Sequence, residues 1–268
     1  IAALEAGKHV IIEKPLALTL EECADIVETS RRTGKGVGYA ENLCFAPKYT
    51  KAKALLDAGR VGDVRFIKQV EKHDGPGTSW FYDADLAGGG ALFDMGCHSI
   101  EFARWLIGKP AVKAVWATMD TWIHRASACE LEDHVVVHLE FEGGVTALLE
   151  SGWTLKGGMA STSEVQGTGG VLHASLFLEG AGMRLFSESA EEPGWQNVDA
   201  DWNRQNGYPQ ELEHFLDCFD RGVQPSESAE DGLAVLEIML AAYASAGSGK
   251  RIELPFRPTN VLRPVDLW

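Results

Sequence analysis

The first 42 positions alternate between the apolar pattern of a strand and that of a helix. The run HVII at 9–12 is typical of a short strand buried on both faces of a parallel sheet. Thr19 and Glu22 have the spacing of a capping box, which predicts a helix from position 20 to the glycines at 34 and 36. The run VGYA at 37–40 predicts the next strand. Two strands joined by a helix indicate half of a doubly wound α/β unit.

Beyond position 42 the pattern changes to consecutive short strands. Strands are predicted at 64–73, 112–122, 133–142, 145–153, 161–167, 171–178 and 183–187, and helices at 47–58, 91–107, 209–220 and 229–246. A glycine pair at 143–144 predicts a hairpin, and strands joined by short turns indicate a mainly antiparallel sheet. The expected fold class is α/β: a partial doubly wound domain at 1–42, a second α/β domain at 43–254 and an extended, proline-rich tail at 255–268.

The net charge bears on the expected partners, and the cysteines bear on disulfides, zinc and the cellular compartment. The 268 residues include 24 Lys and Arg against 39 Asp and Glu, a net charge of −15. Such a chain repels nucleic acid and anionic membranes, so neither is expected as a partner. The five cysteines have an odd count and no CxxC spacing, which argues against a disulfide framework or a structural zinc site and favours a reducing cytoplasm. They are Cys23, Cys44, Cys97, Cys129 and Cys218.

The first candidate for chemistry lies where the two early strands end. Ligands of open α/β sheets bind beyond the carboxyl ends of the strands, which here carry Glu13-Lys14-Pro15 and Glu41-Asn42. Lys14 could bind and polarise a substrate oxygen, and a positively charged ring nearby would lower its pKa. The alternative is a surface lysine that happens to follow a strand.

The second candidate is the run GGGALFDMGCH at 88–98. Its glycines allow close approach of the backbone to a ligand or another segment. Asp94 and His98 stand four residues apart on one helix face, and a carboxylate beside an imidazole suits proton transfer. Two alternatives remain open: a helix-capping Asp94 with a packed His98, or a metal site that includes Glu101, although three ligands on one helix would be cramped.

The two runs together resemble the Gfo/Idh/MocA (glucose–fructose oxidoreductase and inositol dehydrogenase) family. The resemblance rests on AGKHVIIEKP at 6–15 followed by GGGALFDMGCH at 88–98, and it continues through LLDAGRVGDV, the EHF at 213–215 and the closing segment 226–246. It implies a Rossmann domain that binds NAD or NADP, and a second domain with an open, mainly antiparallel sheet that supplies the substrate pocket. The implied activity is hydride transfer between the nicotinamide and a hydroxyl or carbonyl of a sugar, polyol or related compound.

The resemblance also implies roles for single residues. Lys14, Asp94 and His98 match the catalytic trio of the family: Lys14 would hold the reacting hydroxyl, His98 would exchange its proton, and Asp94 would orient both. Glu13, Lys14, Pro15, Glu41 and Asn42 would lie on the cofactor side. The candidates for substrate binding are His73, Trp80, Phe81, Trp153 and Tyr208, with hydrophobic packing between domains as the alternative for Trp80.

The chain departs from the family pattern at its start. A GxGxxG fingerprint should open the first strand-to-helix turn, but only 13 residues precede Lys14. The run GTGG at 167–170 is not a substitute, because it falls between predicted strands. The main phosphate-binding segment is therefore expected to be absent from this chain. Two rival functions stay open: an NAD-dependent glycosidase of the same family, which would share the trio, and a non-catalytic binding or assembly module without the cofactor half.

One face of the strand at 133–142 is a candidate for self-association. Its apolar positions 135, 137, 139 and 141 form one face, which leaves His134, Val136, His138 and Glu140 on the other. That second face is predicted to join the subunits of a homo-oligomer. The tail ends in Leu267-Trp268, an apolar pair that would be exposed on an isolated arm, so it is expected to lie across a neighbouring subunit. The alternative is a tail that folds back on its own domain.

Overall fold

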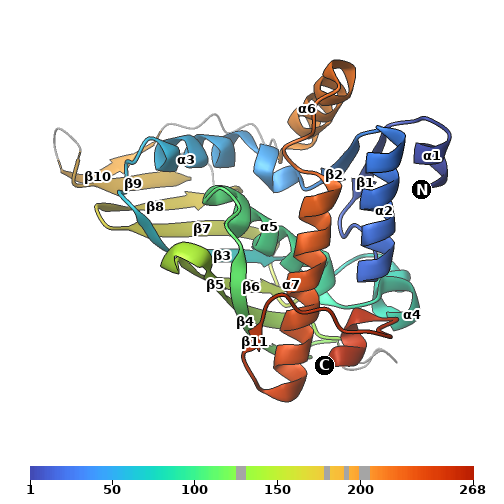
Figure 1. Ribbon diagram of the computed structural model, residues 1–268. Coiled ribbons are helices and arrows are strands. Elements are labelled where there is room, and N and C mark those ends of the chain that lie inside the picture. Colours follow the sequence, from blue (N-terminus) through green and yellow to red (C-terminus); the bar gives the residue numbers. More distant parts are fainter. Residues whose placement is uncertain (125–130, 178–181, 190–192, 199–205) are drawn as a thin grey trace.

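A computed structural model describes residues 1–124, 131–177, 182–189, 193–198 and 206–268, in which the chain forms two sheets (Figure 1). The first sheet consists of β1 (Val10–Glu13) and β2 (Val37–Ala40). The short helix α1 (Ala2–Glu5) precedes β1, and helix α2 (Leu20–Thr33) joins the two strands. The two strands pair in parallel, with Glu13 opposite Ala40. At the start of α2, the backbone N–H of Glu22 donates to Thr19 Oγ1 and that of Thr19 donates to Glu22 Oε2. The parallel pair and the capping box confirm the predicted βαβ pattern.

The second sheet has nine described strands in the order β10-β9-β8-β7-β3-β6-β5-β4-β11. Their bounds are β3 (Val64–Lys72), β4 (Val112–Asp120), β5 (His134–Phe141), β6 (Thr146–Gly152), β7 (Ala160–Gly167), β8 (Gly170–Ser175), β9 (Met183–Ser187), β10 (Gly194–Asn197) and β11 (Ile252–Glu253). Only β3 and β6 pair in parallel among these strands. The mainly antiparallel sheet and the β5–β6 hairpin are therefore confirmed, while the short edge strands β10 and β11 were not predicted. Position 178 of the predicted strand 171–178 lies outside the described residues, as does Cys129.

Helices cover one face of the large sheet (Figure 1). Helices α3 (Pro47–Asp57), α5 (Cys97–Leu106) and α7 (Ala229–Ser248) contact strands of this sheet, whereas the short α4 (Ala84–Ala87) and α6 (Tyr208–Arg221) pack mainly on 3₁₀ turns. The predicted helix at 91–107 begins as a π-helical turn, Leu92–Gly96, before α5. Helix α7 packs against both α2 and β4, and so connects the two sheets. Among the described helices, none combines the length and the apolar character needed to cross a bilayer.

The C-terminal tail folds back on its own chain. Its last residues form a 3₁₀ turn, Pro264–Leu267, that packs against α7. The backbone N–H of Val265 donates to Gly88 O at 3.0 Å, and Arg263 forms an ion pair with Asp85 at 2.7 Å. The prediction of an extended tail reaching a neighbour is therefore wrong for this segment, because the apolar side chains of Val265 and Leu267 pack against the chain's own core.

Candidate functional site

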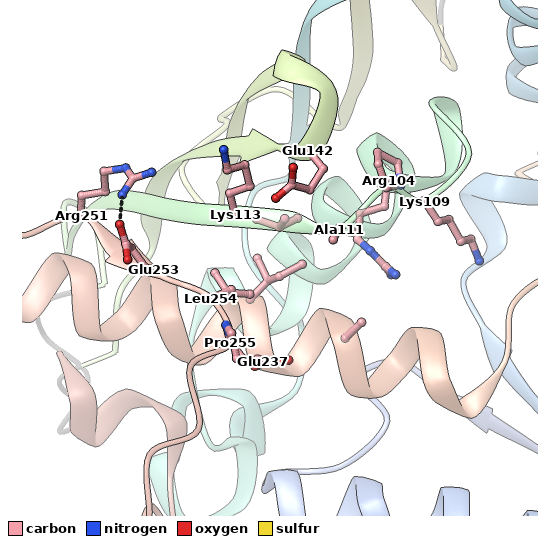
Figure 2. A pocket seen from close by; sticks show the side chains of 14 residues that line it. Arg104, Lys109, Ala111, Lys113, Glu142, Glu237, Arg251, Glu253, Leu254 and Pro255 are labelled. Atoms are coloured by element: carbon pink, nitrogen blue, oxygen red, sulfur yellow. Dashed lines mark hydrogen bonds and ion pairs between the residues drawn. The ribbon is translucent and has the colours of Figure 1, made fainter.

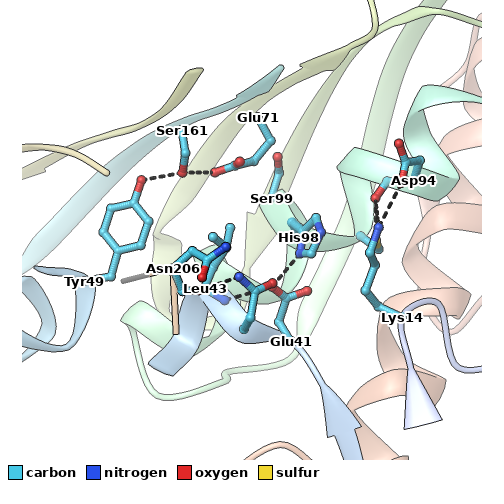
Figure 3. Close-up of polar contacts among 12 residues, drawn as sticks. Lys14, Glu41, Leu43, Tyr49, Glu71, Asp94, His98, Ser99, Ser161 and Asn206 are labelled. Atoms are coloured by element: carbon cyan, nitrogen blue, oxygen red, sulfur yellow. Dashed lines mark hydrogen bonds and ion pairs between the residues drawn. The ribbon is translucent and has the colours of Figure 1, made fainter. Parts of the chain in front are cut away.

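Lys14 and Asp94 meet where the first sheet faces the π-helical turn that precedes α5. Lys14 follows β1, and its ammonium donates to Asp94 Oδ1 at 2.9 Å and to the backbone oxygen of Asp94 at 2.6 Å (Figure 3). Asp94 lies in the π-helical turn, 80 residues further along the chain. The structure thus joins the two motifs that the sequence analysis singled out.

The second carboxylate oxygen of Asp94 accepts hydrogen bonds from two side chains. Trp153 Nε1 donates to Asp94 Oδ2 at 2.9 Å, and His73 Nε2 lies 3.2 Å from the same oxygen. His73 Nδ1 accepts the backbone N–H of Gly75, so the ring proton is on Nε2 and is donated to the carboxylate. Trp153 is fully buried. Both residues were candidates for substrate binding, and the structure places them as hydrogen-bond partners of Asp94.

These contacts keep Lys14 and Asp94 charged. Burial alone would lower the pKa of Lys14, but the neighbouring acidic groups raise it above its usual range. Burial raises the pKa of the Cys97 thiol, so Cys97 is neutral. The negative charge that raises the pKa of Lys14 therefore comes mainly from Asp94. Burial opposes the ionisation of Asp94, yet the hydrogen bond from His73 and the charge of Lys14 hold its pKa well below the usual range. The fall in the Lys14 pKa was predicted for a positively charged ring nearby, and it stays a prediction.

His98 has a different carboxylate as its partner. The imidazole is 9% exposed, and its Nδ1 lies 2.6 Å from Glu41 Oε1. Glu41 follows β2 and is fully buried, although it was expected on the cofactor side. Figure 3 shows the His98 ring between Glu41 and the Lys14–Asp94 pair. The His98–Glu41 contact escaped the sequence analysis because the two residues stand 57 positions apart in unrelated motifs.

Two further candidates, Asn42 and Tyr208, lie around the start of α6. Asn42 is buried, and its side-chain amide donates to the backbone oxygen of Asn206 at 2.5 Å. Tyr208, the first residue of α6, is 46% exposed. Burial, and next the charge of Glu13, raise the pKa of Tyr208, which places the start of α6 near the end of β1.

A pocket of about 300 Å³ opens beside the Lys14–Asp94 pair. It is lined by Glu13, Lys14, Pro15, Trp80, Phe81, Ala87, Gly89, Phe93 and Asp94. The indole of Trp80 is 47% exposed and stacks on Phe81 with a centroid distance of 3.8 Å. The pocket therefore combines an aromatic wall with a charged end, an arrangement suited to the apolar face and the hydroxyls of a sugar ring.

Glu132 is a residue of the site region that the sequence analysis missed. It is fully buried, and its carboxylate accepts the backbone N–H groups of Gly90 and Leu92 and the hydroxyl of Tyr243. A Cβ at Gly90 would collide with the backbone of Glu132, which confirms that this glycine permits a close approach. Burial raises the pKa of Glu132 to about 7, while the Tyr243 hydrogen bond opposes the shift. Glu132 thus fixes the backbone at Gly90 and Leu92, which leads into the π-helical turn that carries Asp94.

A larger pocket, of about 500 Å³, lies elsewhere and contains none of the predicted site residues (Figure 2). Its basic side chains include Lys109, whose Nζ lies 2.9–3.1 Å from the carboxylates of Glu101, Glu227 and Asp231. These three acids stand close enough together to hold a metal ion, but the Lys109 ammonium already forms an ion pair with each of them. Glu101 faces this network, so it does not join Asp94 and His98 in a metal site. We therefore place the candidate site at the smaller pocket.

Comparison with known proteins covers both parts of the chain. Residues 1–41 match the model of an oxidoreductase family with an NAD-binding Rossmann fold, and residues 49–173 match that of the GFO/IDH/MocA C-terminal domain. The chain is 30% identical over 268 residues to inositol 2-dehydrogenase of Azotobacter vinelandii, covering 96% of this chain and 74% of the relative. It is 29% identical over 269 residues to D-glucoside 3-dehydrogenase of Escherichia coli K12, covering 95% and 75%.

Solved structures show the same fold. GenD2 from gentamicin A biosynthesis, in complex with NAD, superposes with a TM-score of 0.82 at 32% identity, over 95% of this chain and 74% of the other. Levoglucosan dehydrogenase, in complex with NADH and levoglucosan, superposes with a TM-score of 0.84 at 26% identity, over 95% and 76%.

Proposed function

Because this chain belongs to the Gfo/Idh/MocA family of NAD-binding oxidoreductases, we propose that it transfers a hydride between a nicotinamide cofactor and a hydroxyl or carbonyl carbon of a sugar or polyol. The observation that carries the proposal is the Lys14–Asp94 pair at the charged end of a pocket with an aromatic wall. Relatives named for inositol, glucoside and levoglucosan substrates support the substrate class.

The residues present fit the nicotinamide end of NAD or NADP. Glu13, Lys14 and Pro15 follow the carboxyl end of β1, where ligands of doubly wound sheets bind, and all three line the pocket. When bound, the cofactor supplies C4 of its nicotinamide ring as hydride acceptor or donor. In this proposal residues 1–42 form the cofactor side of the site and residues 43–254 most of the substrate side.

The chain's own residues divide the remaining work. The raised pKa of Lys14 keeps it an ammonium, so it binds the reacting hydroxyl oxygen and does not act as a base. His98 is the proton acceptor in alcohol oxidation and the donor in carbonyl reduction. Asp94 fixes the Lys14 ammonium and is itself fixed by Trp153 and His73.

The test is a cofactor-coupled assay with a panel of free inositols, glucosides and anhydrosugars. We expect net NADH or NADPH formation, and about a 10²-fold or larger loss of kcat in Lys14→Ala and His98→Ala. Lys8→Ala, at an exposed position outside the site, is the matched control and should retain activity. Release of sugar without net cofactor reduction would instead identify the glycosidase, and normal turnover in both site variants would refute the assigned roles.

We also propose a homo-oligomer joined through the sheet face that the helices leave open. Half-buried Val136, His138 and Glu140 lie on this face of β5, and the 43% exposed indole of Trp116 lies opposite His138 on β4. An exposed indole on such a face supports an interface. Light scattering that returns a mass near 29 kDa at micromolar concentration would refute the oligomer.

A cytoplasmic location is proposed as well. The four cysteines within the described residues are free thiols, which suits a reducing compartment.

A further inference from the structure

Glu41 is a fully buried acid that the proposed reaction does not yet use. It follows β2, and its Oε1 lies 2.6 Å from Nδ1 of His98. Neither Glu41 nor His98 lines the Lys14–Asp94 pocket, and beyond the charge that Glu41 contributes to the raised pKa of Lys14, its short contact is with the imidazole. These positions raise the question of what the carboxylate does to the imidazole.

A buried carboxylate is costly unless it is paired. The Leu43 backbone N–H lies 3.4 Å from Glu41 Oε1, a long contact, whereas the His98 contact is short enough for a charge-assisted hydrogen bond. Glu41 Oε2 has no hydrogen-bond partner within the described part of the chain. The imidazole of His98 is thus the principal partner of this acid. Because a carboxylate only accepts, the proton of the neutral imidazole lies on Nδ1 and Nε2 carries the lone pair.

We propose that Glu41 is a positioning residue for His98, holding the tautomer in which Nε2 accepts a proton and stabilising the imidazolium that results. The kinetic part of this inference rests on the function proposed above, whereas the tautomer does not. During alcohol oxidation the substrate's O–H bond breaks and an Nε2–H bond forms. The carbon that bears the hydroxyl transfers its hydride to the nicotinamide and becomes a carbonyl carbon. The alcohol is oxidised, the nicotinamide is reduced, and Glu41 stays ionised throughout.

Three variants separate this role from a purely structural one. Glu41→Leu removes the acceptor for the Nδ1 proton. Glu41→Gln keeps an acceptor oxygen but removes the charge. Glu71→Gln is the matched control, because Glu71 is equally enclosed, at 2% exposure, and bonds Gln69 and Ser161 in place of His98.

The first readout is the tautomer of His98, measured by NMR on protein labelled with ¹⁵N-histidine. The His98 signals are identified by their loss in His98→Asn. We expect the proton on Nδ1 in the wild type, Glu41→Gln and Glu71→Gln, and a shift toward the Nε2–H tautomer in Glu41→Leu. An unchanged tautomer in a folded Glu41→Leu would overturn the proposal. This measurement decides the Glu41–His98 relation even where the wild type oxidises no sugar or polyol, an outcome that would defeat the proposed function alone.

The second readout is the split between kcat and KM in the cofactor-coupled assay. We expect kcat to fall by about 10²-fold in Glu41→Leu and about 10-fold in Glu41→Gln. KM for the sugar or polyol and KM for the cofactor should stay nearly unchanged, because in this proposal Glu41 contacts neither of them. Glu71→Gln should keep wild-type kcat. A raised KM at unchanged kcat would contradict the positioning role. Where thermal melting shows that Glu41→Leu does not fold, Glu41→Gln carries the test, and wild-type kcat in that variant overturns the proposal.

Discussion

Glu71 is a carboxylic acid enclosed between the large sheet and its helices. It is 2% exposed, and its Oε1 accepts hydrogen bonds from Gln69 Nε2 at 2.6 Å and from Ser161 Oγ at 2.5 Å (Figure 3). The Tyr49 hydroxyl lies 2.6 Å from Ser161 Oγ. Burial raises the pKa of Glu71 to about 8, although the hydrogen bonds from Ser161 and Gln69 oppose the shift. Glu71 is therefore protonated in the folded protein at neutral pH.

The raised pKa fixes the sign of a pH effect on stability. Between pH 4.5, the ordinary value, and about 8, the folded state keeps a proton that the unfolded state releases. The free energy of unfolding therefore falls as pH rises through this window. At 1.36 kcal/mol for each pKa unit, the contribution of Glu71 reaches at most about 5 kcal/mol. Glu132 shifts in the same direction, so the wild-type curve alone does not isolate Glu71.

Glu71→Gln isolates the contribution, because glutamine cannot ionise and keeps an oxygen for Gln69 and Ser161. Urea unfolding at pH values from 5 to 8 should show the variant gaining several kcal/mol on the wild type as pH rises. Glu150→Gln is the contrasting control. Burial opposes ionisation of Glu150, but hydrogen bonds from Lys72 and His134 hold its pKa low, so this variant should lose stability by an amount that varies little over the same range. A gap between Glu71→Gln and the wild type that is constant with pH would refute a neutral Glu71.

Three further outcomes are expected. Trp153→Phe should lower stability by about 1–3 kcal/mol in thermal unfolding and reduce kcat, because it removes a hydrogen bond to the buried Asp94 carboxylate. Trp195→Phe, at an exposed position on the edge strand β10, is its control. Trp80→Ala should raise KM for the sugar more than it changes kcat, because the exposed indole lines the pocket but has no acidic or basic group to exchange a proton. An equal effect on kcat and KM would contradict this. Deleting 257–268 should lower Tm by about 5 °C, because Val265 and Leu267 leave the core; an unchanged Tm would show that the tail adds no stability.

Local sequence patterns predicted most of the fold, because most helices and strands depend on residues that are close together in the chain. The capping box of α2, the alternation along β5 and the glycine pair at 143–144 each act within a few residues. The edge strand β11 is only two residues long and exists through pairing with β4, more than 130 positions earlier, so no local pattern could reveal it. The folded tail was missed for the same reason, since its apolar side chains are buried only by the distant helix α7.

The candidate site divides in a similar way. Lys14 and Asp94 were predictable because each lies in a compact motif next to glycines or a strand end, and the structure joins them directly. The partners that hold them were not predictable. Trp153 was assigned to the substrate, yet its indole is enclosed and bonds a carboxylate 59 positions away. Sequence spacing identifies residue types suited to chemistry, but burial decides whether a side chain faces a ligand or braces another residue.

Two separate carboxylates explain how one small site can hold both a cation and a proton acceptor. Asp94 pairs with Lys14 and Glu41 pairs with His98, so each acid has its own partner. If a single carboxylate served both, the imidazole and the ammonium would compete for it, and the lysine would lose part of the interaction that keeps it charged. With separate pairs, Lys14 stays protonated. In the proposed reaction it would bind and polarise an oxygen, and His98 would be the group that takes the proton. The proposed division of roles between Lys14 and His98 thus follows from which acid each one contacts.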